Sequence, residues 1–242
     1  MSKLFPVLTG LLVVGMLAGC AFNPASVVTG SGRTTTQTYD FTGFTKVDIG
    51  SAFQTEITEG ESYSVSVTID DNLVEYLDVR VDGDTLHIGL KPILSLGFRN
   101  TTLEAKITMP DLAGLNLSGA TRTHITGFSN TKSVSTEVSG ASQLRGDITT
   151  GQMQLRASGA STVELTGATG PLDVEASGAS TVRFDNFKST DTQVRASGAS
   201  NVTVNASGRL TGNASGASSI SYVGSPASVQ VDTSGASSVK QK

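Results

Sequence analysis

The chain has 242 residues and a formal net charge of −4, and charged residues make up only 16 % of it. Because Val, Ile, Leu and Phe recur in alternation and the net charge is small, a disordered chain is excluded. The acidic balance and the lack of any Lys/Arg cluster argue against nucleic-acid binding, since proteins of that class carry a basic footprint.

The first twenty residues have the organisation of a bacterial lipoprotein signal. Lys3 precedes an apolar stretch over residues 4–17, and Leu17-Ala18-Gly19-Cys20 places small residues before the only cysteine of the chain. This pattern predicts a signal peptide over residues 1–19 that is cleaved to leave Cys20 lipidated at the mature N-terminus. Several acyl chains on one residue anchor a protein stably, so the predicted partner of this end is a membrane. An ordinary signal peptide followed by an incidental cysteine is the alternative.

Residues 20–38 are predicted to be the lipidated cysteine and a flexible tether. From Ala21 to about Gln37 the sequence consists of Ala, Asn, Pro, Ser, Thr and Gly with scattered Val. About 17 such residues span roughly 20–25 Å. Ala21 resembles the neighbour of the lipidated cysteine in outer-membrane lipoproteins, because an Asp there is the usual inner-membrane retention signal. We therefore expect a protein of the bacterial cell envelope, with the outer membrane favoured and the periplasmic or surface face left open.

Residues 39–110 are predicted to form a strand-rich but irregular part. Apolar and polar residues alternate over residues 64–69, 79–81 and 86–90, which is the pattern of half-buried strands. Between the last two segments, Asp82-Gly83-Asp84 predicts a hairpin turn.

Two further segments of this part are expected to differ from strands. A short helical turn capped by Asp71 is predicted over residues 71–77. The apolar run over residues 93–98 is interpreted as a cap over the end of the stacked core, and an exposed partner-binding patch is the alternative.

From residue 111 to residue 242 the chain repeats one short unit. The triplet Ser-Gly-Ala recurs at intervals of 18 to 21 residues, starting at Ser118, Ser139, Ser158, Ser177, Ser197, Ser215 and Ser234. Apolar residues stand mainly three and five residues before each Ser and five and seven after it, so each unit holds two short strands with one buried face. Near-constant spacing indicates stacked units, and we predict an all-β, parallel β-helix of about 19-residue coils capped by residues 39–110.

The triplet is predicted to be the corner between the two strands. Gly adopts backbone conformations that a side chain forbids, and Ser and Ala are small enough to stack. The corner glycines are Gly119, Gly140, Gly159, Gly178, Gly198, Gly216 and Gly235.

Outward positions carry charges that alternate in sign from coil to coil. Two residues before the Ser the alternating residues are Glu137, Arg156, Glu175 and Arg195, and six after it they are Arg145, Glu164 and Arg183. Opposite charges one layer apart attract, and a slip of register would bring like charges together. Both rows are interpreted as devices that set the register.

A search for catalytic chemistry finds little. The repeated Ser occupy equivalent corners with no base beside them, and His87 and His124, the only two histidines, are expected on solvated faces. Polysaccharide lyases and hydrolases with a β-helix fold need a groove lined with carboxylates or basic residues. The residues of this chain that most resemble such a group are Asp173, Glu175, Arg183 and Asp185. The charge rows already account for two of them. We therefore predict no catalytic residue, no cofactor and no metal site.

Several segments carry a resemblance to one known family. They are residues 44–49, 53–60, 65–67, 70–73, 83–88, 109–112 and 117–120, which read FTKVDI, FQTEITEG, VSV, DDNL, GDTLHI, MPDL and LSGA. Over roughly Phe41 to Val239 the chain resembles the putative auto-transporter adhesin, head GIN domain family. The resemblance implies a right-handed parallel β-helix in bacterial envelope proteins, often lipoproteins, and it supplies no catalytic residues.

Three functional hypotheses remain. The leading one is a non-enzymatic, lipid-anchored envelope protein that binds an unidentified envelope or extracellular partner, as an adhesin or a spacer. The second is a periplasmic scaffold that self-associates through the open end of the β-helix, where strand edges are unpaired. The third is a β-helix carbohydrate-active enzyme, which rests on fold analogy alone.

Overall fold

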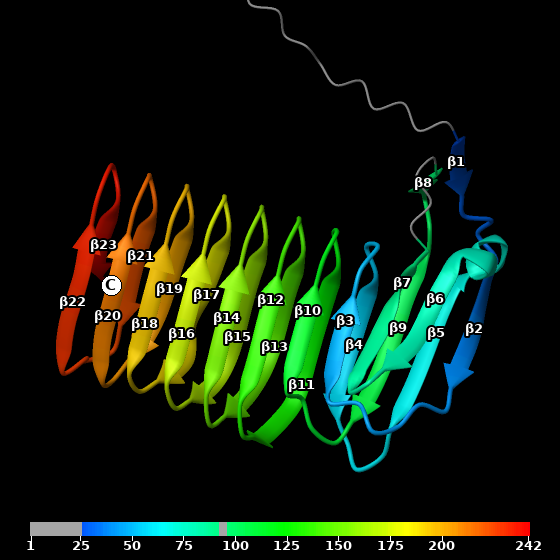
Figure 1. Ribbon diagram of the computed structural model, residues 1–242, viewed down its shortest axis with the longest axis horizontal. Helices are drawn as coiled ribbons and strands as arrows, with labels where there is room; N and C mark the ends of the chain where they lie inside the picture. Colours follow the sequence, from blue (N-terminus) through cyan, green and yellow to red (C-terminus); the bar gives the residue numbers. More distant parts are fainter. Residues whose placement is uncertain (1–25, 92–95) are drawn as a thin grey trace, which may run out of the picture.

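Two large β-sheets face each other along the whole molecule (Figure 1). The computed structural model describes residues 26–91 and 96–242. One sheet has ten strands and the other eleven, and a separate sheet of two strands lies at the N-terminal end. The prediction of an all-β, parallel β-helix with an N-terminal strand-rich part is confirmed.

Each repeat contributes one strand to each large sheet. The strands that precede the Ser-Gly-Ala corners form the ten-stranded sheet: β10 (Gly114–Leu117), β12 (Val134–Val138), β14 (Met153–Ala157), β16 (Leu172–Ala176), β18 (Thr192–Ala196), β20 (Arg209–Ala214) and β22 (Ser228–Thr233). The strands that follow the corners lie in the eleven-stranded sheet: β11 (Arg122–Thr131), β13 (Gln143–Thr150), β15 (Thr162–Thr169), β17 (Thr181–Ser189), β19 (Asn201–Ala206), β21 (Ser219–Val223) and β23 (Ser238–Gln241).

Successive coils pair in parallel, and equivalent residues lie opposite one another. Leu155 on β14 pairs with Val174 on β16, which pairs with Val194 on β18. These side chains point between the two sheets and are buried. The core is therefore only as wide as one coil, and its largest fully buried side chains are Phe44, Phe53, Phe128, Phe184 and Phe187.

The triplet glycines lie in the turns that join the two sheets, and they stack on one another. All seven have φ between 69° and 76°. A Cβ on Gly140 would lie 2.4 Å from the carbonyl oxygen of Gly119, and the same oxygen accepts a hydrogen bond from the N–H of Ala141 at 2.8 Å. A side chain at the corner is thus disfavoured both by the backbone conformation and by the coil beneath it.

The residue after each triplet is a second repeated feature, which our sequence analysis missed. It is always Ser or Thr, and in six of the seven coils it is buried: Thr121, Ser142, Ser161, Ser180, Ser200 and Ser218. The hydroxyl of Ser200 donates to the carbonyl of Ala176 in the preceding coil at 3.3 Å. Ser180, Ser218 and Ser237 form the equivalent bond, whereas the buried hydroxyls of Thr121, Ser142 and Ser161 have no hydrogen-bond partner. A small residue at this position leaves room for the turn, and in the later coils its hydroxyl also bonds one corner to the preceding coil.

The outward charge rows have the expected register. Glu137, Arg156 and Glu175 lie opposite one another on β12, β14 and β16, and Nε of Arg156 is 3.5 Å from Oε2 of Glu175. Arg195 differs in detail, because it pairs diagonally with Asp173 at 3.0 Å. The rows are exposed, so each ion pair contributes little to stability and mainly selects the register.

The N-terminal part continues the stack and then closes it. β3 (Lys46–Ile49) and β4 (Gln54–Glu59) form a coil against β10 and β11, and β7 (Thr85–Leu90) and β9 (Leu103–Met109) stack in parallel beyond that coil. β6 (Leu77–Asp82) then pairs antiparallel with β7, and β5 (Ser64–Asp70) pairs antiparallel with β9. Since these strands run against the direction of the coils, parallel stacking ends here.

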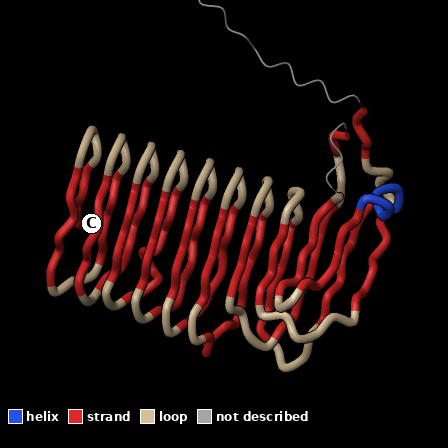
Figure 2. The backbone as a smooth tube through the Cα atoms, in the orientation of Figure 1, coloured by secondary structure: helices blue, strands red, loops and turns tan. Residues whose placement is uncertain are grey.

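Two local predictions in this part agree with the structure, and the second of them differs from it in one detail. The turn at Asp82-Gly83-Asp84 joins β6 to β7, and Gly83 has φ of 59°. The helical turn is the 3₁₀ helix η1 (Asp71–Tyr76), shown in blue in Figure 2. Its N-cap is Asp70 and not Asp71, and the Asp70 side chain caps no helical N–H.

The predicted flexible tether is wrong for residues 26–38. β1 (Ser26–Thr29) pairs with β8 (Leu96–Arg99) in the two-stranded sheet, and β2 (Thr34–Tyr39) pairs antiparallel with β5 at the end of the eleven-stranded sheet. The polar composition suggested a solvated chain, but Thr is a good strand former and β5 offers an unpaired edge that β2 covers. Residues 20–25 lie outside the described residues.

A cluster of hydrogen bonds holds the segment between β1 and β2 to the cap. The buried carboxylate of Asp70 accepts from the N–H of Gly32 at 2.8 Å and from the N–H of Thr102 at 2.6 Å. Asn72 donates to the carbonyl of Thr29 at 2.9 Å. The Ser31 hydroxyl and the Arg33 guanidinium beside Asp71 lower the pKa of its carboxyl.

The apolar run over residues 93–98 is only partly described. Residues 92–95 lie outside the described residues, and the remainder enters β8, in the separate two-stranded sheet. Phe98 is half-buried and contacts Tyr76 edge-on, with ring centroids 5.6 Å apart. The capping strands themselves close the end of the core, with this aromatic pair beside them.

Candidate binding face

Most of the residues singled out in the sequence have structural roles. Cys20 lies outside the described residues, and the triplet glycines form turns. The four residues nearest to a carbohydrate-active site do not converge, because Asp173 and Glu175 lie on β16 and Arg183 and Asp185 lie on β17, in the opposite sheet. Asp173 pairs with Arg195, and Asp185 pairs with Lys242 at 2.9 Å.

His87 is not the solvated residue that we expected. Its side chain is 25 % exposed, and its Nδ1 lies 2.9 Å from Oδ2 of Asp48 on the neighbouring strand. Oδ1 of Asp48 accepts from the amide of Asn116 at 2.9 Å. This row crosses β7, β3 and β10, so it ties the N-terminal coils to the first repeat.

The corner beside His87 departs from the repeat. Here Gly50-Ser51-Ala52 takes the place of Ser-Gly-Ala, and both Ser51 and Ala52 have positive φ, of 60° and 65°. The Ser51 hydroxyl accepts from the N–H of Leu90 at 3.0 Å, which fastens the corner to the next coil. Because the polar groups named here bond to one another, we interpret this region as structural.

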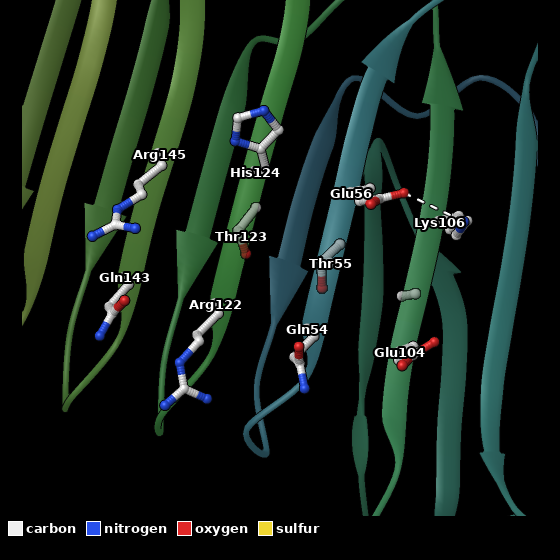
Figure 3. Close-up of a pocket in the computed structure, with 11 residues that line it drawn as sticks. Gln54, Thr55, Glu56, Glu104, Lys106, Arg122, Thr123, His124, Gln143 and Arg145 are labelled. Carbon is white, nitrogen blue, oxygen red and sulfur yellow. Dashed lines mark ion pairs between the residues drawn. The ribbon is translucent and has the colours of Figure 1, made fainter.

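A different surface has the character of a binding site. On the outer side of the eleven-stranded sheet, β9, β4, β11 and β13 surround a depression of about 370 Å³ (Figure 3). Its polar lining residues are Gln54, Glu56, Glu104, Lys106, Arg122, His124, Gln143 and Arg145. We call this surface the N-terminal polar face.

Strand register arranges the centre of this face as a grid. Arg122 on β11 lies opposite Gln54 on β4 and opposite Gln143 on β13, and two residues further on His124 lies between Glu56 and Arg145. Neighbouring strands are ~4.8 Å apart and alternate residues along a strand ~6.6 Å apart, so the six side chains occupy a regular two-by-three array. Thr55 and Thr123 point to the other side of the strands (Figure 3), where both are buried.

The side chains of this face are unusually free of intramolecular contacts. Two ion pairs lie at its edges, Lys106 with Glu56 at 3.5 Å and Arg145 with Glu164 at 3.5 Å. Within the described residues, four side chains at its centre and one at its edge form no hydrogen bond or ion pair: Gln54, Arg122, His124, Gln143 and Glu104. Polar groups that are held in register but not bonded to one another are available to a ligand.

The chemistry of the face is that of charge-assisted hydrogen bonding. Arg122 presents five N–H donors in a planar fork, and the two carboxamides beside it supply both donors and acceptors. Apart from the imidazole of His124, the lining contains no aromatic ring. No cluster of three or more His, Cys, Asp or Glu suited to a metal ion occurs in the part of the chain that the structure describes.

Sequence reasoning missed this face because the first two coils do not carry the repeated triplet. Gln54 stands four residues after Gly50, as Arg122 stands four after Ser118, but the permuted corner Gly50-Ser51-Ala52 hides the equivalence. Glu104 and Lys106 come from β9, which follows β4 by more than forty residues in the chain yet adjoins it in the sheet. Treating Gly50-Ser51-Ala52 as a corner would have found the row of Gln54, Arg122 and Gln143, but not β9.

The helical content of residues 26–91 and 96–242 is small. The single helix of this part, η1, has six residues, and no helix there is long and apolar enough to cross a bilayer.

Comparison with known proteins identifies both a family and a fold. Residues 43–226 match the family model described as "Putative auto-transporter adhesin, head GIN domain". A crystal structure of a putative adhesin from Bacteroides fragilis superposes with a TM-score of 0.81 at 21 % identity, covering 89 % of this chain and 100 % of that one. No protein with a curated functional description matches the chain.

Two further solved structures share the fold. A putative lipid binding protein from Parabacteroides distasonis has a TM-score of 0.70 at 19 % identity, covering 90 % of this chain and 100 % of that one. A putative adhesin from Parabacteroides merdae has a TM-score of 0.67 at 16 % identity, with the same coverage of both chains. At these identities the likeness concerns the fold and carries no ligand or site residue to this chain.

Proposed function

Since the chain belongs to the head GIN domain family of adhesin-like proteins, we propose that it is a non-enzymatic binding module of the bacterial envelope, anchored through lipid on Cys20. One observation carries the binding function. The N-terminal polar face holds uncommitted polar side chains in fixed register on a rigid parallel sheet. A surface of this kind loses little backbone conformational entropy when a ligand binds, because its strands are already ordered.

The position of the N-terminus supports an anchor at the capped end. β1 begins at Ser26 beside the capping strands (Figure 1), six residues after Cys20. Six residues reach at most ~20 Å even when fully extended. A lipid on Cys20 therefore holds the cap close to the membrane, with the coils that end at β22 and β23 at the opposite end of the stack.

The anchor is tested with the full-length protein and a Cys20→Ser variant, each carrying an epitope after Lys242. We expect labelled fatty acid to be incorporated into the first protein and not the second, and only the first to fractionate with the outer membrane. Release of the wild-type protein as a soluble species without label would refute the anchor. Protease treatment of intact cells then decides between the surface, where the epitope is lost, and the periplasm, where it is protected.

The adhesin-like role is tested in the same strains. Deleting the protein is expected to reduce attachment of the cells to host or bacterial surfaces if the epitope is accessible from outside. If the epitope is protected, cross-linking in intact cells should capture an envelope partner. Turnover of a polysaccharide by the purified protein, lost in both Asp173→Asn and Asp185→Asn, would instead favour a carbohydrate-active enzyme.

A self-associating scaffold is the second candidate, and one feature of the far end favours it. β22 and β23 are the last strands of the two large sheets, and the side chain of Val229 on β22 is 43 % exposed. An unpaired, partly apolar strand edge is a template for pairing with another chain. Sedimentation of the full-length protein in detergent should then show a concentration-dependent rise in mass that Val229→Lys suppresses. A constant monomer would exclude this candidate.

A further inference from the structure

We propose that the N-terminal polar face is a binding site for an anionic glycan, a saccharide chain that carries carboxylate or sulfate groups. This inference rests on the proposed binding function and names the ligand class of the same surface. The central residues are Gln54, Arg122, Gln143, His124 and Arg145.

Arg122 is the residue that favours an anionic ligand. Its side chain lines the depression between Gln54 and Gln143 (Figure 3), and within the described residues it forms no ion pair or side-chain hydrogen bond. Some arginines elsewhere on the two sheets do so, since Arg156 pairs with Glu175 and Arg209 with Asp191. A guanidinium flanked by carboxamides on both sides, with no carboxylate directly opposite it, has its planar fork open to an external carboxylate or sulfate.

The polar groups around the Arg122 guanidinium favour a saccharide. Gln54 and Gln143 offer both donors and acceptors, and Glu104 at the edge is an uncommitted acceptor. Sugar hydroxyl groups both donate and accept, so they can use all of these groups. The phosphodiesters of a lipid surface only accept hydrogen bonds and would leave the carboxamide oxygens and Glu104 without a donor. The array also repeats at ~4.8 Å across the strands, which is close to the length of one sugar ring in an extended chain.

The scarcity of aromatic rings around the depression disfavours a neutral saccharide. Proteins that bind neutral sugars usually stack an aromatic ring on a sugar face, and His124 is the one ring among the lining residues. Without stacking, affinity has to come from charge-assisted hydrogen bonds, which require a charge on the ligand. We therefore expect the site to distinguish anionic from neutral chains of equal length.

The experiment measures binding of the full-length protein, purified in detergent, to defined probes by calorimetry at low salt. The anionic probes are a galacturonate hexamer and a chondroitin sulfate hexasaccharide. The neutral probe is maltohexaose, and phosphatidylglycerol vesicles provide an anionic surface without sugar. We expect at least one anionic hexasaccharide to bind, more weakly at higher salt, and maltohexaose to bind at least about tenfold more weakly.

Two matched variants locate the site. Arg122→Gln is expected to weaken anionic glycan binding about tenfold or more, because it removes the central charged donor. Arg183→Gln removes the same charge from an exposed residue of β17 that also lacks a partner among the described residues but does not line the depression, and binding should be unchanged. Glu104→Gln is expected to strengthen binding about two- to threefold by removing a like charge. Thermal unfolding of each variant checks that the fold is retained.

Several results would overturn the proposal. They are equal binding of anionic and neutral hexasaccharides, no binding of either anionic probe, equal loss in Arg122→Gln and Arg183→Gln, or tighter binding to the vesicles than to both glycans. These results leave the lipid anchor untouched, because calorimetry in detergent does not depend on where the protein resides. Failure of fatty-acid labelling at Cys20 would in turn leave the glycan site untouched.

Discussion

The outer surfaces of the middle coils and of the coils next to the cap use similar residues differently. On β14 and β16 each charged side chain has an opposite charge one coil away, as in the pair of Arg156 and Glu175. On β11, by contrast, Arg122 lies between the carboxamides of Gln54 on β4 and Gln143 on β13. It has no partner among the described residues. The same parallel register therefore has two outcomes. Opposite charges neutralise one another on β14 and β16, whereas polar side chains near the cap remain without intramolecular partners.

The same contrast extends to the corners. In the repeat every corner has a glycine with positive φ, and from Gly140 onward each lies against the corner glycine of the preceding coil. At the Gly50-Ser51-Ala52 corner, residues with side chains take positive φ, and the Ser51 hydroxyl bonds to the next coil. Uniform stacking needs glycine, whereas the N-terminal coils replace that uniformity with specific side-chain contacts.

The largest expected effect comes from placing a side chain at a stacked corner. In Gly178→Ala the new Cβ would lie 2.7 Å from the carbonyl oxygen of Gly159, at a φ of 69°. Backbone strain and this contact together should lower the free energy of unfolding by about 3 kcal/mol. Urea unfolding followed by circular dichroism measures the loss. Ala179→Ser, at the exposed next residue, should change it by less than about 0.5 kcal/mol, and equal losses would contradict the stacking argument.

The next effect concerns the cap. Asp70→Asn replaces a buried carboxylate that accepts two backbone N–H groups, and one of those donors would face the amide NH₂. We expect a loss of about 2 kcal/mol in unfolding free energy. Hydrogen exchange should show faster exchange at Gly32 and Thr102 than in the wild type, with the repeat coils protected as before. Loss of protection throughout the repeat would show that the hydrogen-bonded N-terminal cap and the repeat coils unfold as one unit.

A charge reversal tests the difference between the two outer surfaces. Arg156→Glu would place a carboxylate between Glu137 and Glu175, so we expect a loss of about 1 kcal/mol that salt reduces. Arg122→Glu lies between Gln54 and Gln143 and should cost less than about 0.5 kcal/mol. Chemical denaturation at low and high salt makes this comparison. Equal costs would mean that the ladder charges do not set the register.

The smallest effect is a pH dependence shared by both regions. The pKa of Asp191 is lowered from 3.8 by hydrogen bonds from the backbone and side chain of Arg209, and the pKa of Asp71 is lowered from the same value by Ser31 and Arg33. A carboxyl whose pKa is lower in the folded state stabilises the fold above its unfolded pKa and loses that contribution as the pH falls through the folded value. Stability should therefore fall slightly below about pH 4. Denaturation midpoints between pH 5 and pH 2.5 should fall less in Asp191→Asn and Asp71→Asn than in the wild type.

The repeat was predictable from sequence because each coil meets neighbours like itself. The alternation around each triplet, the corner glycines and the charge rows required only that equal units stack in register, as Leu155, Val174 and Val194 do. The N-terminal coils obey no such rule. Composition alone predicted a flexible tether for residues 34–38, and only the unpaired edge of β5 explains why they form a strand.

The candidate site shows the same division. His124 and Arg145 stand six residues after a triplet Ser, a position that the repeat alignment marked as outward, and the structure places them there. Arg122, four residues after Ser118, lay outside the marked rows. Gln54 and Glu56 were hidden by a permuted triplet, and Glu104 and Lys106 by a long excursion of the chain. His87 was assigned to solvent because its partner Asp48 lies on a strand that adjoins it only in the folded sheet.

By itself, the sequence determined the solenoid, its spacing and its register, because a period of about 19 residues with two-residue alternation allows one stacking in which apolar side chains meet inside. Tertiary structure decided how the stack ends and what its outer surface offers. The coil β7–β9 lies beyond β3–β4 although it follows them in the chain, and antiparallel strands close the core there. Those long-range pairings bring four strands together around Arg122, and no local pattern records them.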